Sequence, residues 1–171
     1  MIGGSLALQC RKKGIVSQII GVDNNPLHAS SAVSLNLVDE MKSLDEAIAS
    51  SEIIVLAVPM NALVSLLPTV LDKIDQHVVI DMGSTKSILT NAVKNHPKRG
   101  RFVATHPMWG TEYSGPSAAV EGAFENKAVI LCDIENSDSD AVDFATEMYK
   151  KMNMHIKYQK WANLLTKLNG E

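Results

Sequence analysis

The amino-acid sequence predicts an α/β fold built around a doubly wound, mostly parallel sheet. Short runs rich in β-branched residues alternate with longer segments of helical period along most of the 171 residues. Several of the short runs are apolar almost throughout, as strands covered by helices on both faces must be. Explicit start signals precede some of the helical segments. Strands that alternate with helices in this way imply parallel neighbours joined by helical crossovers.

Six short runs are expected to form strands, at residues 18–22, 52–58, 77–81, 101–105, 127–132 and 154–158. The segments around them are expected to form helices, at about residues 3–13, 26–36, 43–50, 61–73, 86–95 and 138–152. Pro26 follows two asparagines, as a residue at the first helical position does. Ser43, with Glu46 three residues later, has the pattern of a capping box and predicts the start of the next helix.

Composition and charge limit the class of protein. The length fits one domain with a proper core, and 46% apolar with 20% charged residues is ordinary for a soluble globular protein. A net charge of −3 gives no reason to expect nucleic acid or an anionic membrane as a partner. Cys10 and Cys132 have no metal-ligand spacing around them, so we expect buried thiols and no metal site. No signal peptide or membrane-spanning apolar run is visible, which predicts a cytoplasmic protein.

Several chemically distinctive residues follow directly after the expected strands. In a doubly wound sheet, ligands bind beside the carboxyl ends of the strands. The residues at those ends are Asp23, Val58 with Pro59, residues 81–86 and residues 106–115. The sequence therefore predicts a ligand site along this edge of the sheet.

A glycine pair and an aspartate predict dinucleotide binding. Gly3, Gly4 and Ser5 open the first expected helix, and a helix N-terminus attracts the pyrophosphate of a dinucleotide. Asp23 ends the run QIIGVD about 20 residues later, where a carboxylate binds both ribose hydroxyls and repels a 2′-phosphate. This arrangement favours NAD over NADP. Only the final glycine of the G-x-G-x-x-G fingerprint, Gly3, is present.

Ser84 and His106 are the candidate reactive residues. Ser84 follows Gly83 between a strand and a helix, where a serine can equally be a plain N-cap. His106 ends a strand, is followed by Pro107, and precedes a polar loop that runs to Gly115. Its place at the ligand edge of the sheet favours a catalytic over a structural histidine. The remaining histidines, His28, His77, His96 and His155, are interpreted as surface or strand-edge residues.

Five segments are informative together: IGGSLAL, IIGVDNNPLHASSAVSLNLVDE, LAVPMNALVSLLP, VVIDMGSTKSIL and NHPKRGRFVATHPMWGTEYSGPSAAVEGAFENKAVIL. They resemble the cofactor domain of the prephenate dehydrogenase family from Met1 to about Tyr158, and the H-P-x-x-G-T-E-x-S-G stretch is specific to that family. The resemblance implies a Rossmann-like dinucleotide-binding domain over residues 1–158 and a divergent tail over residues 159–171.

The resemblance also implies an activity, the NAD-dependent oxidative decarboxylation of prephenate to 4-hydroxyphenylpyruvate in tyrosine biosynthesis. His106 would accept the proton of the substrate's ring hydroxyl as hydride leaves for NAD. Ser84 would bind the same hydroxyl or orient the imidazole, and Thr111 and Glu112 would shape the substrate side of the cleft. Val58 and Pro59, at a strand end, would join Gly3, Gly4, Ser5 and Asp23 on the cofactor.

The chain departs from the family pattern at both ends. The family's opening strand and first two glycines are absent, because Met1 stands where a residue inside the motif belongs, so an N-terminally truncated sheet is expected. After Tyr158 the family continues into a helical domain that supplies dimer contacts and basic residues for the substrate carboxylates, whereas here QKWANLLTKLNGE follows. We therefore expect poor turnover by the chain alone. Trp109 also stands where many relatives carry a small residue.

The truncation has a topological consequence. The first strand of a doubly wound sheet lies between the strand that ends at Asp23 and the one that ends at Val58. Without it, those two strands should be separated or forced to pair directly. Residues 160–168 are not expected to fill the position, because their apolar spacing is helical.

Three functional hypotheses stay open from the sequence. The first is a prephenate dehydrogenase cofactor domain, with arogenate as an alternative substrate. The second is a non-catalytic nucleotide-binding fragment that pairs with a full-length homologue. The third is another hydroxyacid or imine reductase of the same fold, against which the THPMWGTEYSG loop argues.

Overall fold

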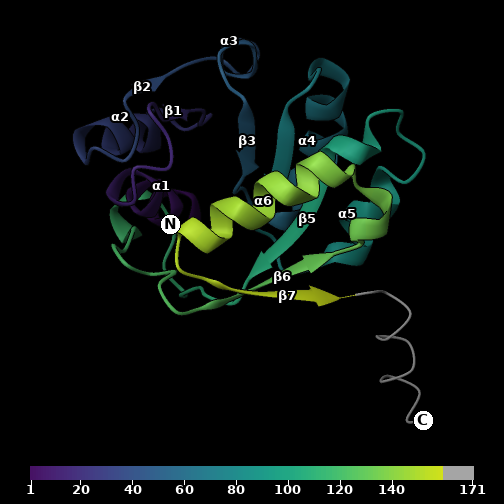
Figure 1. The fold of residues 1–171 in the computed structure, drawn as a ribbon. Coiled ribbons are helices and arrows are strands. Elements are labelled where there is room, and N and C mark those ends of the chain that lie inside the picture. The colour runs from purple at the N-terminus through teal and green to yellow at the C-terminus, as the bar shows by residue number, and fades with distance from the viewer. Residues whose placement is uncertain (160–171) are drawn as a thin grey trace.

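The computed structural model describes residues 1–159 as alternating helices and strands (Figure 1). The helices are α1 (Ile2–Lys12), α2 (Pro26–Ser34), α3 (Leu44–Ala49), α4 (Met60–Lys73), α5 (Lys86–Ala92) and α6 (Ser139–Lys151). The strands are β1 (Ile20–Gly21), β2 (Glu40–Met41), β3 (Ile53–Leu56), β4 (Val78–Asp81), β5 (Phe102–Pro107), β6 (Ala128–Cys132) and β7 (His155–Gln159). Short 3-10 turns occur at η1 (Arg99–Arg101), η2 (Pro116–Ala118) and η3 (Ile134–Asn136). The predicted α/β class is confirmed.

The strands form two separate sheets. One has five strands in the order β3-β4-β5-β6-β7, and the other contains only β1 and β2. All neighbouring strands are parallel except β5 and β6. The sheet is therefore mostly parallel, as predicted. Within residues 1–159, β1 and β3 are not paired with each other, so of the two expected outcomes, separation and direct pairing, the structure has the first.

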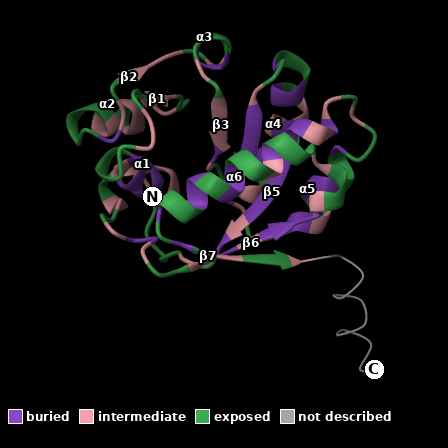
Figure 2. Cartoon of the chain, viewed as in Figure 1, coloured by how far each residue is buried: buried purple, intermediate pink, exposed green. Residues whose placement is uncertain are grey.

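Helices cover both faces of the five-stranded sheet (Figure 1). On one face, leucines of α4 and α5 pack against Val79, Phe102 and Ala104 of the central strands. On the other face, α1 and α6 pack against Ile80, Val103 and Leu131. The central strands β4 and β5 are accordingly almost entirely buried (Figure 2). Cys10 and Cys132 are free thiols buried in these two cores, as the sequence predicted.

The predicted helix starts are confirmed at α2 and α3. The side chain of Asn25 accepts hydrogen bonds from the Leu27 and His28 amides, and Pro26 is the first helical residue. The Ser43 and Glu46 side chains form the reciprocal bonds of a capping box at the start of α3.

Some boundaries differ from the prediction. Strand β2 was not predicted, because two partly exposed residues carry no periodic pattern. Strand β1 has two residues instead of five, and β3 ends at Leu56, before Val58. Helix α5 ends at Ala92, three residues early. Strand β5 continues through His106 to Pro107, because it pairs with β6 beyond the predicted end at residue 105.

The tail predicted for residues 159–171 and the helical spacing predicted for residues 160–168 lie outside the described residues, apart from Gln159, the last residue of β7. Among the helices within residues 1–159, none is long and apolar enough to cross a membrane.

Candidate functional site

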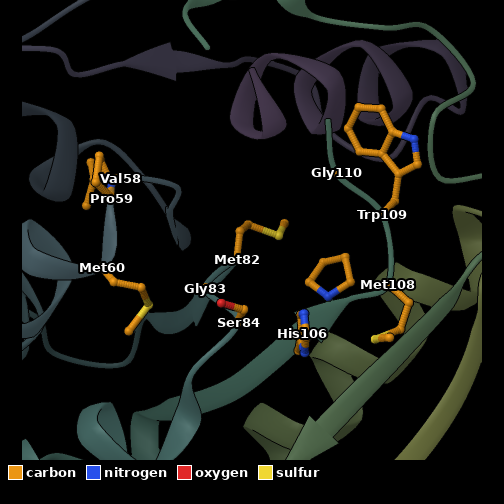
Figure 3. Close-up of a pocket in the computed structure, with 11 residues that line it drawn as sticks. Val58, Pro59, Met60, Met82, Gly83, Ser84, His106, Met108, Trp109 and Gly110 are labelled. Atoms are coloured by element: carbon orange, nitrogen blue, oxygen red, sulfur yellow. The ribbon is translucent and has the colours of Figure 1, made fainter. Parts of the chain in front are cut away.

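A cavity of about 630 Å³ opens where β3, β4 and β5 end (Figure 3). Three chain segments line it: Val58–Met60 before and at the start of α4, Met82–Ser84 after β4, and His106–Gly110 at the end of β5 and beyond it. The carboxyl edge of the sheet, which the sequence predicted as the ligand site, is therefore hollowed. Val58 and Pro59, predicted as cofactor residues, lie in its wall.

The cavity opens because β4 and β5 separate near their ends. The two strands are in register at Val79–Phe102 and Ile80–Val103. Beyond that point the Thr105 amide donates to the Asp81 carboxylate (3.1 Å), and the Thr105 hydroxyl donates to the Asp81 carbonyl oxygen (2.5 Å). Side-chain bonds thus continue the link between the strands where the backbone ladder has ended, directly beneath the cavity.

His106 is the second-last residue of β5; it is half-buried and lines the cavity. Its backbone is opposite Ile130 of the antiparallel strand β6, and Pro107 after it still belongs to the strand. Burial lowers the pKa of the imidazole, the positive charge of Lys86 lowers it further, and the negative charge of Asp81 opposes the shift. The ring is therefore neutral at neutral pH and can accept a proton.

Ser84 lies beside His106 at the cavity. It is exposed in the turn between β4 and α5, and both residues also line a second, smaller cavity of about 260 Å³ together with Lys86 and Cys132. Ser84 is not the N-cap of α5, because that position is taken by Thr85. The structure thus brings the two candidate reactive residues together from different strands.

Asp81 and Lys86 form a buried ion pair below these two residues. Burial raises the pKa of the Asp81 carboxyl and lowers the pKa of the Lys86 ammonium, while their mutual attraction opposes both shifts. Sequence reasoning placed both residues in the ligand edge but assigned them no role. The available signal was a carboxylate that closes the apolar run VVI, since such a buried charge requires a partner.

The other predicted cofactor residues, Gly3, Gly4, Ser5 and Asp23, lie around the start of α1 and the end of β1, outside the lining of the cavity. Gly3 and Gly4 are in the first turn of α1, where a Cβ on either would come within 3.0 Å of Ala57 or of Ala119 and Leu37. Asp23 is exposed after β1.

Ser5 and Asp23 differ in their exposure and in the hydrogen bonds that their side chains make within the protein. Ser5 is fully buried; its hydroxyl donates to the Met1 carbonyl and accepts from the Val120 amide (2.9 Å). Its hydroxyl is thus used inside the protein. Asp23 accepts from the Asn25 amide and lies 3.6 Å from Nδ1 of His28.

The loop after β5 runs from the cavity to the start of α1. Thr111 donates to the sulfur of Met1 (3.1 Å), so the loop lies against the start of α1. Trp109 lines the cavity and contacts Phe124 edge to face, with ring centroids 5.4 Å apart. Thr111 and Glu112, predicted as substrate residues, are exposed in this loop just beyond Gly110, the last lining residue of the 630 Å³ cavity.

A family model described as "Prephenate dehydrogenase, nucleotide-binding domain" matches residues 6–158. The chain belongs to this family. It is 31% identical over 160 residues to the prephenate dehydrogenase of Bacillus subtilis (strain 168), an alignment that covers 91% of this chain and 43% of that protein. It is 30% identical over 135 residues to the prephenate dehydrogenase of Lactococcus lactis, covering 77% of this chain and 38% of that protein. The chain thus spans less than half the length of these curated relatives.

Solved structures of prephenate dehydrogenase family members superpose on the chain. That of Aquifex aeolicus prephenate dehydrogenase in complex with hydroxyphenyl propionate and NAD+ has a TM-score of 0.85 and 27% identity, and covers 93% of this chain and 56% of that one. Synechocystis arogenate dehydrogenase has a TM-score of 0.83 and 26% identity, covering 95% of this chain and 57% of that one. The fold of this domain is therefore a Rossmann-like domain of that family.

Proposed function

We propose that this chain provides the NAD-binding domain and the proton-accepting residue of a prephenate dehydrogenase. The observation that carries the proposal is the meeting of His106 and Ser84 at one cavity on the carboxyl edge of the sheet, within a domain of that family. The reaction class is oxidative decarboxylation of prephenate to 4-hydroxyphenylpyruvate.

The residues around α1 and β1 fit a dinucleotide. The amides of Ile2, Gly3 and Gly4 precede the first bond of α1, from the Ser5 amide to the Met1 carbonyl, and such first-turn amides bind pyrophosphate. The exposed Asp23 carboxylate can accept both ribose hydroxyls, which favours NAD over NADP. Both the amide and the hydroxyl of Ser5 are already bonded inside the protein and the residue is fully buried, so we propose no direct contact from Ser5 to the cofactor. NAD, when bound, supplies the acceptor for the substrate's hydride.

The protein's part in the reaction is the removal of one proton. In its neutral form His106 accepts the proton of the ring hydroxyl as the carbon that bears it is oxidised. Ser84 donates to or accepts from the same hydroxyl, or holds the imidazole in place. Thr111 and Glu112 border the entrance from the exposed loop. Carbon dioxide leaves readily because its loss makes the substrate ring aromatic.

Two measurements test the proposal. Calorimetric titration of the 171-residue chain with NAD+ should give a saturable binding isotherm, and lack of binding would count against the domain assignment. In a protein that joins this domain to the remaining part of a full-length relative, prephenate-dependent NADH formation should fall about 10²–10⁴-fold when His106 is replaced by Asn, the usual contribution of a general base. A His106→Asn protein as active as the unchanged one would overturn the proposed role.

Arogenate is a second candidate substrate, because the domain is as similar to Synechocystis arogenate dehydrogenase as to the A. aeolicus enzyme. Parallel assays with prephenate and arogenate separate the two. Because the chain alone is expected to turn over poorly, the assays use this domain joined to the remaining part of a full-length relative; NAD+ binding without turnover of either substrate by that protein would favour the non-catalytic nucleotide-binding alternative.

A further inference from the structure

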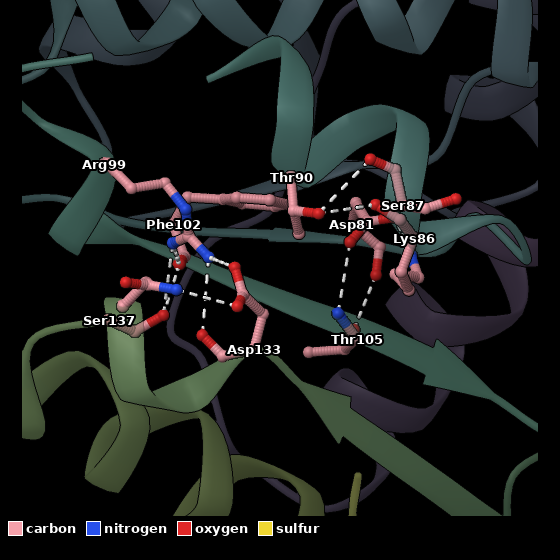
Figure 4. Close-up of polar contacts among 10 residues, drawn as sticks. Asp81, Lys86, Ser87, Thr90, Arg99, Phe102, Thr105, Asp133 and Ser137 are labelled. Carbon is pink, nitrogen blue, oxygen red and sulfur yellow. Dashed lines mark hydrogen bonds and ion pairs between the residues drawn. The ribbon is translucent and has the colours of Figure 1, made fainter. Parts of the chain in front are cut away.

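Three donors converge on the buried carboxylate of Asp81, and Figure 4 shows the residues of two of them, Lys86 and Thr105. Its Oδ2 accepts from the Gly83 amide (2.9 Å) and from the Lys86 ammonium, and its Oδ1 accepts from the Thr105 amide (3.1 Å). The Asp81 side chain is 0% exposed and that of Lys86 only 4%. An ionised carboxylate accepts all three bonds, and it does so where no water competes for them.

The donors belong to the segments that carry the two candidate reactive residues. Gly83 immediately precedes Ser84, and Thr105 immediately precedes His106. The β4–β5 backbone pairing has already ended at Ile80 and Val103, so the Asp81 carboxylate links these segments in place of the ladder. Thr105 is held from its other side as well, because its hydroxyl lies 2.7 Å from the hydroxyl of Tyr149.

Lys86 and His106 meet at the smaller cavity. Both residues line it, together with Cys132 of β6 and hydroxyl-bearing residues of the β4–α5 turn. Across the sheet, His106 pairs with Ile130 of β6, and Ile130 pairs with Lys157 of β7. The side chain of Lys157 is exposed. Among residues 1–159, the charges buried beside the imidazole are therefore those of Asp81 and Lys86.

We propose that Asp81 and Lys86 are positioning residues for His106: the carboxylate fixes the His106 segment against the Ser84 segment, and the ammonium ion beside the imidazole holds it in the neutral form. The proposal rests on the role of His106 as proton acceptor. Burial alone would also disfavour the imidazolium, but the Lys86 charge is the part that a substitution can remove.

The charge part is tested by NMR titration of the His106 imidazole in the whole chain without ligand. Lys86→Gln should raise the pKa of His106 by about half a unit or more, because it removes a cation and leaves the carboxylate. Lys86→Arg keeps the charge and should leave the pKa within about 0.2 units of that of the unchanged protein. If the pKa of His106 changed by the same amount in Lys86→Gln and Lys86→Arg, in either direction, the charge part of the proposal would be overturned.

The positioning part is tested by hydrogen exchange of the Gly83 and Thr105 amides. Asp81→Asn should lower the protection of both amides at least about tenfold relative to the rest of β4 and β5. The matched control is Asp133→Asn, which breaks another buried ion pair, Arg99–Asp133 (2.6 Å), shown beside the first pair in Figure 4.

Asp133 comes directly after Cys132 in the sequence. Cys132 pairs with Ala104, whereas His106 pairs with Ile130, so Asp133 lies just past the end of β6, away from His106. The control variant should destabilise the whole protein without a selective loss at these two amides and without moving the pKa of His106. The same exchange pattern in both variants would overturn the positioning role. If Asp81→Asn does not fold, the Lys86 variants still decide the charge part, and exchange in the unchanged chain decides the positioning part: the Gly83 and Thr105 amides should exchange as slowly as the amides of β4 and β5, and fast exchange of either would overturn it. Because neither readout involves turnover, failure of the proposed activity is recognised separately.

Discussion

At the scale of single residues, the neutral form of His106 sets an acid limit on the proposed activity. The pKa of this imidazole lies below its ordinary value of 6.5, chiefly because of burial and then because of the Lys86 charge. A general base works only when unprotonated, so we expect activity to be constant near pH 7 and to fall tenfold per unit once the pH drops below this lowered pKa. A pH–rate profile measures this fall in activity at acid pH. An inflection above 6.5 that disappears in His106→Asn would contradict the assigned environment.

Asp23 determines the expected choice between the two nicotinamide dinucleotides. Its exposed carboxylate is proposed to bind the ribose hydroxyls and would repel a 2′-phosphate, so Asp23→Ala should weaken NAD+ binding and reduce the preference over NADP+. Calorimetric titrations with both dinucleotides measure the ratio. Glu121→Gln, which removes an exposed carboxylate on the loop that precedes β6, is the control for net charge and should leave the ratio unchanged. Equal or tighter binding of NADP+ to the unchanged chain would refute the prediction.

The sequence located the two candidate reactive residues but not the buried residues beneath them. Ser84 and His106 were identifiable because each follows a strand and joins a polar loop, and the structure places both at one cavity. The network of Asp81, Lys86 and Thr105 was not identifiable as a unit, since the partners depend on the β4–β5 register. A pattern along one strand carries no information on which residue of the next strand lies opposite.

At the scale of elements, the well-predicted boundaries are those with local chemistry. Asn25–Pro26 and Ser43–Glu46 define helix starts through bonds made within four residues, and both were predicted correctly. Strand β5 was predicted too short because its last two residues are held by β6, a partner far along the chain. The antiparallel direction of β6 follows from the same connection. Residues 108–127 contain only a 3-10 turn, whereas a parallel crossover usually needs a longer helix.

The capping box of α3 gives an element-scale prediction. The Ser43 hydroxyl accepts from the Glu46 amide, and the Glu46 carboxylate accepts from the Ser43 amide (3.1 Å) and hydroxyl (2.6 Å). Ser43→Ala should lower the free energy of unfolding by about 1 kcal/mol, which denaturant titration can measure. The exposed Ser17 provides the control, because Ser17→Ala removes a hydroxyl outside any helix. Equal losses in both variants would show that the box does not stabilise α3.

The capping box of α3 also makes the stability of the protein depend on pH. The Ser43 bonds hold the pKa of Glu46 below its ordinary value, so this contribution is complete above the ordinary pKa and is lost as the pH falls through the lowered one. In Ser43→Ala the pKa of Glu46 should return toward the ordinary value, which side-chain NMR can follow.

At the scale of the whole molecule, the sheet has two open edges where a doubly wound fold is normally continuous. Among residues 1–159, β3 pairs only with β4 and β1 only with β2. An unpaired backbone group costs about 1–3 kcal/mol when it is fully buried, and less at β1 and β3, which are mostly half-buried, against a net stability of about 5–15 kcal/mol for a typical domain. We expect the 171-residue chain alone to unfold below about 60 °C and to associate through these edges as its concentration rises.

Thermal melts and light scattering over a concentration series test this expectation. Val22→Lys introduces a charge at the exposed residue after β1 and should reduce association, since lysine at a strand edge disfavours pairing with another chain. A monomer that unfolds cooperatively above about 60 °C would show that the open edges matter less than their unpaired groups suggest.

Trp109 gives the cavity an optical reporter. Its indole lines the cavity while its ring contacts Phe124 edge to face, so a ligand entering there changes the polarity around the excited ring. The chain has one other tryptophan, Trp161. In a Trp161→Phe background the emission would come from Trp109 alone, and its wavelength and intensity would follow occupation of the cavity directly, without a coupled reaction and even for a ligand that is never converted.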